Sequence, residues 1–338
     1  MSHTRSVSNL PKIIAVVGPT AVGKTAIAVA LAESLGGEVV SLDSRQLYRR
    51  LDIGTAKPSS AERARARHHL VDVADPRSIL SLSDVQAMAF EAIDEILSRG
   101  KLPILAGGTG QYVRAVLEGW KIPEVAPDPS LRAELEVFAH EQGAAALHAR
   151  LALVDPRSAE RIDARNIRRV IRAIEIYTHA GEPMSTIVDR AAPPYQVCKI
   201  GLERPRPVLY ARVDARISSM LESGLETEVR ELLADGIGFD LPTMSGLGYA
   251  EWRDYLAGEI DLEEVVRLIK RNTRRFIRNQ DTWFRRDDAS IQWFDLEETE
   301  PGAILDFARR KVSHDSHSDA HASPPRSIPH HRRARPAR

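Results

Sequence analysis

The sequence feature that most constrains the fold is the run Gly18–Thr25, which reads Gly-Pro-Thr-Ala-Val-Gly-Lys-Thr. This run fits G-x-x-x-x-G-K-[ST], the phosphate-binding P-loop. An apolar, β-branched run at 13–17 precedes it and is typical of a buried parallel strand. An Ala- and Leu-rich run at 26–35 follows it and is typical of a helix. Because strand, glycine loop and helix occur in this order, the sequence predicts a phosphate site built from loop N–H groups and the positive end of the helix.

Two side chains add chemistry to this loop. Lys24 brings a full positive charge, and the Thr25 hydroxyl is the group that binds Mg²⁺ in a P-loop. The motif alone does not identify the molecule whose phosphate is bound. The residues predicted to contact the phosphate are Gly18, Pro19, Thr20, Ala21, Val22, Gly23, Lys24 and Thr25.

Asp43 is the first candidate for a catalytic carboxylate. It directly follows a predicted strand at 39–42, and ligands of open α/β sheets bind beyond the carboxyl ends of the strands. We therefore expect Asp43 close to the P-loop, as a Mg²⁺ contact or as a general base, with a turn-capping role as the alternative. Asp72 ranks lower because it falls inside a predicted strand that begins at His68. No second ligand cluster accompanies His68 and His69, so we expect surface or hydrogen-bonded histidines and no metal site.

A glycine-rich stretch follows another predicted strand. The run 102–106 is apolar and leads into Gly-Gly-Thr-Gly at 107–110, where glycines allow the backbone to approach a ligand closely. Thr109 offers a hydroxyl at this edge of the sheet, although tight strand-to-helix packing is the alternative interpretation. Earlier in the chain, Ser83 is the predicted N-cap of a helix that runs to about Ser98.

The character of the chain changes after Trp120. Prolines at 123, 127 and 129 mark a boundary, and residues 130–180 show helical spacing without alternating strands. An apolar strand at 196–202 then resumes the earlier pattern. The predicted fold class is α/β, with a P-loop NTPase-like core in which helices flank a parallel sheet, plus an inserted all-helical domain. The predicted boundaries are 12–125 and 196–312 for the core, 126–195 for the insertion, and 313–338 for a disordered tail that lacks large hydrophobic residues.

Two basic stretches are candidate surfaces for nucleic acid. In the insertion, four arginines share one stripe if they lie on a single helix, and a solvated charged face is the alternative interpretation. These arginines are Arg161, Arg165, Arg168 and Arg172. The second stretch, 262–286, is a strongly basic helical pattern with cations at four-residue spacing. The aligned cations are Lys270, Arg274 and Arg278.

Arg212 and Arg216 lie one turn apart in a predicted helix at 208–233. Two arginine side chains at this spacing can both bind one pyrophosphate. Pairing with Asp214 or with nearby glutamates is the alternative interpretation.

Composition narrows the class of protein. The chain has 338 residues, and its 47 Lys and Arg balance its 47 Asp and Glu, which does not exclude nucleic acid because local patches matter more than the sum. The single cysteine, Cys198, cannot form an internal disulfide and fits a reducing cytoplasm. The polar N-terminal segment lacks the apolar run of a signal peptide, and no run approaches the length of a membrane span. We expect a monomeric, cytoplasmic protein with no membrane partner.

Three motifs at matching spacing resemble one family. The P-loop is followed by D-S-R-Q-L-Y at 43–48 and by D-I-G-T-A-K-P at 52–58. This set resembles the tRNA dimethylallyltransferases (tRNA isopentenyltransferases), whose pattern runs G-P-T-[AG]-x-G-K-[ST], D-S-x-Q-[IL]-Y and D-I-G-T-A-K-P. The resemblance extends over residues 13–304 and departs from the family at Asn279, where a second basic residue is usual.

The resemblance implies an activity and roles for residues. The expected reaction transfers the dimethylallyl group of dimethylallyl diphosphate to N6 of adenosine 37 in the anticodon stem-loop of tRNA, with diphosphate as the second product. Asp43 and Thr109 are the expected catalytic residues, Arg216 and the P-loop bind the diphosphate, and Mg²⁺ binds at Thr25. The expected tRNA contacts are Asp43, Ser44, Arg45, Gln46, Thr109, Arg132, Arg168, Arg169, Val170, Ile171, Arg172, Ser245, Gly246, Leu247, Gly248, Tyr249, Arg274 and Arg278.

Three rival functions share parts of this pattern. A small-molecule kinase has the P-loop and the α/β core but needs ATP, and it has no use for the basic helix at 262–286. An adenylate isopentenyltransferase uses the same donor with a free nucleotide, which leaves the large basic surface unexplained. A non-catalytic RNA-binding protein leaves Asp43 and the intact P-loop unexplained.

Overall fold

The computed structural model describes residues 10–187 and 194–313. The tail predicted at 313–338 therefore lies, apart from Ser313, outside the described residues. The chain forms two compact units. The first contains residues 1–79, 88–113 and 194–338, and the second contains 80–87 and 114–193. The second unit is larger than the insertion predicted at 126–195, and we keep the predicted domain boundaries as a proposal.

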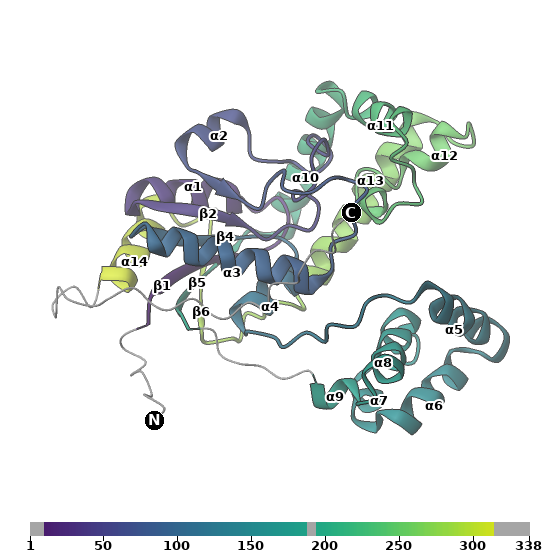
Figure 1. Cartoon of the computed structure of the whole chain (residues 1–338). Coiled ribbons are helices and arrows are strands. Elements are labelled where there is room, and N and C mark those ends of the chain that lie inside the picture. Colours follow the sequence, from purple (N-terminus) through teal and green to yellow (C-terminus); the bar gives the residue numbers. More distant parts are fainter. Residues whose placement is uncertain (1–9, 188–193, 314–338) are drawn as a thin grey trace, which may run out of the picture. The chain divides into compact units, whose positions relative to one another are not determined.

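The first unit is built on a six-stranded, fully parallel sheet with the strand order β3-β2-β4-β1-β5-β6 (Figure 1). The side chains of residues 13–17 in the central strand are wholly buried, as their apolar run predicts. The strands are β1 (Lys12–Val17), β2 (Gly37–Ser41), β3 (His68–His69), β4 (Leu102–Ala106), β5 (Gln196–Glu203) and β6 (Ile291–Asp295).

Helices cover both faces of this sheet. Crossovers between parallel strands are right-handed, so the connection from β1 to β2 and the returning connection from β3 to β4 place their helices on opposite faces. The last helix of the described chain, α14, packs beside α1 (Figure 1). The helices with residues in this unit are α1 (Lys24–Leu35), α2 (Ser60–Arg65), α3 (Leu82–Ser98), α4 (Gly110–Leu117), α10 (Arg206–Glu222), α11 (Leu225–Ala234), η2 (Pro242–Ser245), α12 (Trp252–Leu256), α13 (Leu262–Gln280) and α14 (Pro301–Ser313).

The strand order brings three loops to one edge of the sheet. β2, β4 and β1 are neighbours, with Ala106 of β4 in register with both Ser41 and Val16. Their carboxyl ends lead into Asp43, into the glycines at 107–108, and into the P-loop. The predicted meeting of these loops is confirmed, and it follows from the parallel order of the strands.

Several element boundaries differ from those predicted. The helix predicted at 208–233 is two helices, α10 and α11, because Gly224 adopts a positive φ of 95° between them. The N-cap of α3 is Ser81 and not Ser83, since the Ser81 hydroxyl accepts the Asp84 N–H. The pattern at 262–286 is helical only to Gln280. The strand beginning at His68 has two residues, so the placement of Asp72 inside a strand was wrong.

The second unit contains helices joined by loops, and no named strand falls in its described part. Three of its helix starts carry side-chain caps: Asp128 precedes Pro129 of α5, Asp155 precedes Pro156 of α7, and Asn166 caps α8. A buried apolar cluster from α5 to α8 forms its core. The helices lying wholly in this unit are α5 (Pro129–Gln142), α6 (Ala144–Val154), α7 (Pro156–Arg161), α8 (Ile167–Ala180) and α9 (Met184–Ile187).

The single arginine stripe predicted in this unit is not formed. Arg161 is the last residue of α7, and Arg165 lies in the turn before α8, where it pairs with Asp163. Arg168 and Arg172 are the only two members of the predicted stripe that lie on α8. The turn after α7 interrupts the helical spacing on which the prediction depended.

Candidate active site

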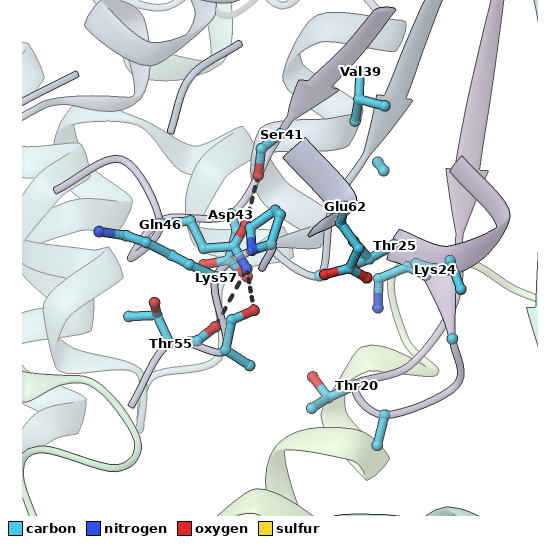
Figure 2. A pocket seen from close by; sticks show the side chains of 18 of the residues that line it. Thr20, Lys24, Thr25, Val39, Ser41, Asp43, Gln46, Thr55, Lys57 and Glu62 are labelled. Atoms are coloured by element: carbon cyan, nitrogen blue, oxygen red, sulfur yellow. Dashed lines mark hydrogen bonds between the residues drawn. The ribbon is translucent and has the colours of Figure 1, made fainter. Parts of the chain in front are cut away.

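A cavity of 390 Å³ opens at the carboxyl edge where the three loops meet (Figure 2). Its wall comes from the P-loop, from the loops after β2 and β4, from α2 and from α10. The sequence predicts the first three of these contributions and Arg216 of α10. The contribution of α2 and of the segment before it was not predicted. All of this wall belongs to the first unit.

The backbone of the P-loop needs its glycines. Gly18 has a φ of 146°, and a Cβ there would lie 2.4 Å from the carbonyl oxygen of Leu202 on β5. Gly23 has a φ of 117° where α1 begins, and Ala21 between them has a φ of 65°. This backbone turns amide groups toward the start of α1, which is the arrangement that binds phosphate.

Lys24 is folded over this loop. Its ammonium donates hydrogen bonds to the carbonyl oxygens of Gly18 at 3.0 Å and Pro19 at 2.8 Å. Burial lowers the pKa of Lys24 from 10.5 to about 8, against the opposing effect of the negative charge of Asp43, and the charge of Arg216 lowers it further. The predicted phosphate-binding cation therefore lies in the cavity, close enough to Asp43 and Arg216 to respond to their charges.

Asp43 faces the same space as Lys24. One carboxylate oxygen, Oδ1, accepts the Arg45 N–H at 2.9 Å, so the turn-capping role is present. The other oxygen, Oδ2, points toward Gly108: a Cβ built on that glycine would lie 3.8 Å from Oδ2 and also 3.8 Å from the Lys24 ammonium. Oδ2 therefore reaches the space beside Lys24, which is the position expected of a general base next to a bound diphosphate.

Thr109 is joined to the loop that carries Asp43. Its Oγ1 accepts the Ser44 N–H at 3.1 Å and donates to the Ser44 hydroxyl at 3.3 Å. The two predicted catalytic residues are thus brought together through Ser44, although they lie on different strands' loops. Gly107 makes this approach possible, because a Cβ there would lie 2.2 Å from the carbonyl oxygen of Leu42.

Arg212 and Arg216 both line the cavity, as predicted. The guanidinium of Arg212 donates through Nε to the carbonyl oxygen of Ala21 at 2.7 Å, so it braces the P-loop. Burial, with the charge of Arg212, lowers the pKa of Arg216, and Glu62 opposes that shift. The alternative pairing with Asp214 is not formed, because Asp214 accepts two hydrogen bonds from Arg274.

The residues present fit a magnesium ion of the kind found in P-loop proteins. Thr25, Asp43 and Glu62 supply a hydroxyl and two carboxylates to the cavity wall (Figure 2). Mg²⁺ prefers such oxygen ligands together with substrate phosphates and water. Within 10–187 and 194–313, no group of three or more His, Cys, Asp or Glu side chains is arranged as a ready metal site.

Two predicted tRNA contacts, Arg45 and Gln46, also organise the site. The Arg45 guanidinium donates to the carbonyl oxygens of Pro242 at 2.6 Å and Thr243 at 3.3 Å, and to the Ser245 hydroxyl at 3.2 Å. The Gln46 side chain accepts from the Ser41 hydroxyl at 2.9 Å and donates to the backbone at 55–56 (Figure 2). Both side chains are half-buried, so internal contacts set their positions.

The side chains of three other predicted tRNA contacts are buried. Val170 and Ile171 are 0% and 3% exposed and belong to the apolar core of the second unit. Tyr249 is 0% exposed, and its hydroxyl donates to the buried carboxylate of Glu228 at 2.7 Å. The sequence alone does not show whether an apolar or aromatic residue faces a ligand or the core.

The remaining predicted contacts differ in exposure and pairing. Arg132 and Arg172 both pair with the fully buried carboxylate of Glu175. Arg168 and Arg169 are exposed, and no carboxylate in the described part of the chain pairs with either of them. In the 245–248 segment, Ser245 is exposed, Leu247 is half-buried, and Gly246 and Gly248 are buried.

The basic face of α13 forms a second hollow, of 270 Å³, lined entirely by cations. The predicted contacts Arg274 and Arg278 belong to it. Its lining residues are Arg267, Lys270, Arg271, Arg274 and Arg278. The predicted alignment of cations along this helix is confirmed.

Three residues of the site were missed. Lys57 lines the cavity and donates to the carbonyl oxygen of Tyr48 at 2.7 Å; it is the only cation in the D-I-G-T-A-K-P motif, which was a signal for it. Glu62 comes from α2, whose sequence carries no motif. Gln280 accepts the Thr20 N–H at 2.8 Å and donates to the Gly108 carbonyl oxygen at 2.7 Å.

The two histidines at 68–69 are hydrogen-bonded, as predicted. His68 binds a backbone carbonyl oxygen, and His69 binds Glu38.

Comparison with known proteins places this geometry in context. Residues 46–287 match the family model of IPP transferase. The chain is 54% identical over 275 residues to a tRNA dimethylallyltransferase of Chloroflexus aggregans, covering 81% of this chain and 93% of that protein. It is 55% identical over 274 residues to a tRNA dimethylallyltransferase of Roseiflexus castenholzii, covering 81% and 90%.

Solved structures agree. The full-length tRNA isopentenylpyrophosphate transferase of Bacillus halodurans is 42% identical, with a TM-score of 0.67, and the match covers 90% of this chain and 98% of that one. A eukaryotic dimethylallyltransferase, whose crystal structures follow its action on tRNA, has a TM-score of 0.76 at 23% identity, which is a likeness of fold. No helix in the described part of this chain is long and apolar enough to cross a bilayer.

Proposed function

The chain belongs to the IPP transferase family of tRNA dimethylallyltransferases, and we propose that it transfers a dimethylallyl group from dimethylallyl diphosphate to N6 of adenosine 37 in tRNA. In this reaction the bond between the allylic carbon and the diphosphate oxygen breaks, and its electron pair leaves with diphosphate. The N6 lone pair forms the new carbon–nitrogen bond, and N6 gives up one proton. The products are N6-(dimethylallyl)adenosine and diphosphate.

The observation that carries this proposal is the convergence of Lys24 and Asp43 beside Gly108. A cation on a phosphate loop and a carboxylate at the same point suit a reaction that releases an anion and a proton together. The donor is a diphosphate ester, and the loop needs to recognise only its phosphates.

The cavity offers N–H groups and cations to the diphosphate of dimethylallyl diphosphate. Loop N–H groups, the Lys24 ammonium and the Arg216 guanidinium stabilise the negative charge that grows on the leaving group. Mg²⁺ at Thr25, with Asp43 or Glu62 nearby, would supply further positive charge to the diphosphate oxygens when bound. Arg212, which already binds the P-loop backbone, keeps that loop in place.

The acceptor end needs a base and a polar contact. Asp43 accepts the N6 proton as the new bond forms. Thr109, tied to the Asp43 loop through Ser44, provides a hydroxyl near the adenine. The adenine must leave its stack to enter the cavity, which costs little in the single-stranded part of an anticodon loop.

We assign the tRNA surface to exposed cations. Arg168 and Arg169 on α8 are exposed and have no carboxylate partner among the described residues, and the cationic hollow on α13 offers several more cations. The partner is the anticodon stem-loop, and the helical domain at 126–195 contributes the first of these contacts. We propose that the enzyme acts as a monomer in the cytoplasm, which size-exclusion chromatography and localisation test directly.

Mass spectrometry of tRNA tests the function. Incubation of the protein with unmodified tRNA, dimethylallyl diphosphate and Mg²⁺ is expected to yield N6-(dimethylallyl)adenosine at position 37, without ATP. A matched reaction in which ATP replaces dimethylallyl diphosphate is the control. Obligatory ATP hydrolysis with no prenyl transfer would instead favour a small-molecule kinase.

A further inference from the structure

One wall of the active-site cavity is an irregular segment, residues 52–58. Thr55, Ala56, Lys57 and Pro58 line the cavity, yet this segment belongs to none of the described strands or helices. Sheet hydrogen bonds therefore do not hold the wall in place. Two backbone hydrogen bonds, from Ala56 N–H to the Ile53 carbonyl oxygen and from Lys57 N–H to the Asp52 carbonyl oxygen, fold the segment on itself. Side chains that bind its backbone tie it to the rest of the unit.

Glu228 of α11 binds one end of this segment. Its carboxylate accepts hydrogen bonds from three successive backbone N–H groups: those of Asp52 at 2.9 Å, Ile53 at 2.8 Å and Gly54 at 3.2 Å. The residue is only 9% exposed. Successive amides that point at one place form an anion-binding concavity, and here an internal carboxylate occupies it. Hydrogen bonds to a charged acceptor are stronger than those to a neutral one.

Tyr249 completes this contact. Its hydroxyl donates to Glu228 at 2.7 Å, so the carboxylate accepts four hydrogen bonds. The ring lies directly against the segment, because a Cβ on Gly54 would come within 2.5 Å of the ring carbon Cζ. A Cβ on Gly248 would lie 3.2 Å from the Gly54 carbonyl oxygen. Glycine at position 54 is therefore required for the close approach.

The cavity side of the segment has its own ties. The Gln46 side chain donates to the carbonyl oxygens of Thr55 at 3.3 Å and Ala56 at 3.1 Å. The Lys57 ammonium reaches back to Asp52 at 2.6 Å and also binds Asp72. The segment is thus held from the cavity side by Gln46 and from the far side by Glu228.

We propose that Glu228 is a positioning residue for prenyl transfer, acting through the backbone at 52–54 to hold the wall at 55–58 in place. The proposal rests on the proposed function, since it concerns the same cavity. Glu228 is buried and does not line the cavity, so it acts on the wall and not on the groups bound inside the cavity. The P-loop, which binds the diphosphate, has no contact with Glu228 among the described hydrogen bonds. Loss of Glu228 should therefore disturb the transfer step and leave diphosphate binding intact.

The sharpest test is Glu228→Gln with Glu226→Gln as the matched control. Both residues are on α11, and among the described residues the Glu226 carboxylate binds Arg230 and Tyr255, which lie outside the segment 52–58. The amide of Glu228→Gln keeps one acceptor oxygen for four donors and loses the charge. We expect single-turnover transfer to slow by roughly ten- to a hundredfold, since small misplacements in an active site cost this much. The affinity for inorganic pyrophosphate, measured by calorimetry, should stay unchanged in both variants.

Two further variants separate positioning from general stability. Tyr249→Phe removes one of the four hydrogen bonds and should slow transfer less than Glu228→Gln. If Tyr249 acts through Glu228, its effect should largely disappear in the Glu228→Gln background, as a double-mutant cycle would reveal. Should Glu228→Gln fail to fold, the same transfer assay is applied to Tyr249→Phe and Gly54→Ala. Each of these variants disturbs the contact between Glu228, Tyr249 and the segment 52–54 without changing Glu228 itself.

The outcomes distinguish this proposal from the one on which it rests. Equal transfer rates in Glu228→Gln and Glu226→Gln would overturn the positioning role. Parallel loss of transfer and of pyrophosphate binding would also overturn it, since that result indicates general unfolding of the site. Absence of any prenylated tRNA with the unmutated protein would instead contradict the proposed function.

Discussion

Gln280, the last residue of α13, accepts a hydrogen bond from the backbone N–H of Thr20 in the P-loop at 2.8 Å, although 260 positions separate them in the chain. The same side chain donates to the Gly108 carbonyl oxygen at 2.7 Å. One buried amide therefore joins the phosphate loop, the glycine loop after β4 and the basic helix. This relationship couples the end of α13 to the geometry of the cavity.

Replacement of Gln280 by Ala should loosen both loops. It leaves a backbone donor and a backbone acceptor without their partner, at a cost of about 1–3 kcal/mol for each group that water cannot reach. We expect a lower free energy of unfolding and weaker binding of dimethylallyl diphosphate, measured by denaturant titration and by calorimetry. Asn279→Ala is the control, because Asn279 is the exposed neighbour. Equal effects of the two variants would contradict the coupling.

Replacement of Asp43 by Asn should slow the chemical step. The adenine N6 amine becomes acidic only as its bond to the allylic carbon forms, so a base contributes most at the transition state. Asn keeps the shape and one acceptor but removes charge and basicity, and loss of a general base costs about 10²–10⁴-fold in rate. Single-turnover transfer measures this loss, and tRNA and donor affinities should change far less. A transfer rate close to that of the unmutated enzyme would rule out the role, and a matching collapse of diphosphate binding would indicate a Mg²⁺ ligand instead.

The affinity for dimethylallyl diphosphate should depend on pH through the protonation of Lys24. Its pKa is lowered by burial from 10.5 to about 8, so the ammonium loses its proton as the pH rises through about 8. Donor affinity should then fall above that pH by up to about tenfold per unit. Lys24→Arg should lack this decline because a guanidinium stays charged. Between pH 8 and 10.5 the unfolded chain binds more protons at this group, so its contribution to stability rises with pH in that window.

Calorimetric titration of dimethylallyl diphosphate from pH 7 to 10 in the absence of tRNA checks this prediction. The unmutated protein and Lys24→Arg should differ only above about pH 8. Parallel curves for the two proteins would indicate that another group controls the pH dependence.

Replacement of Arg168 and Arg169 by Gln should weaken tRNA binding. Both are exposed cations without a carboxylate partner in the described chain, and each phosphate contact contributes roughly 0.7–0.9 to the slope of log affinity against log salt. A salt series of tRNA dissociation constants measures this slope, and donor binding should be unaffected. Arg165→Gln is the matched control because Arg165 already pairs with Asp163. An unchanged salt slope in the double variant would show that these arginines form only a solvated face.

The sequence by itself determined the core of the site. The P-loop pattern, with a strand before it and a helix after it, requires a particular local backbone. Asp43 directly follows one predicted strand, and Thr109 follows another after two glycines. Parallel strands send their carboxyl ends to one edge, and the neighbouring positions of β2, β4 and β1 in the sheet bring these residues together there. Arg216 was also placed correctly, because one helical turn from Arg212 puts both cations on one face.

Only the tertiary structure decided which motif residues face inward and which distant residues complete the site. Tyr249, Val170 and Ile171 are tRNA contacts that the resemblance implies, yet their side chains are buried. Helical or turn spacing does not show which side of an element its neighbours cover. The contacts of Gln280 and Glu228 could not be predicted from the local sequence, since each side chain accepts backbone N–H groups from segments far away in the chain. Such contacts arise from how whole elements pack, and the free energy that selects them is not contained in any short stretch of sequence.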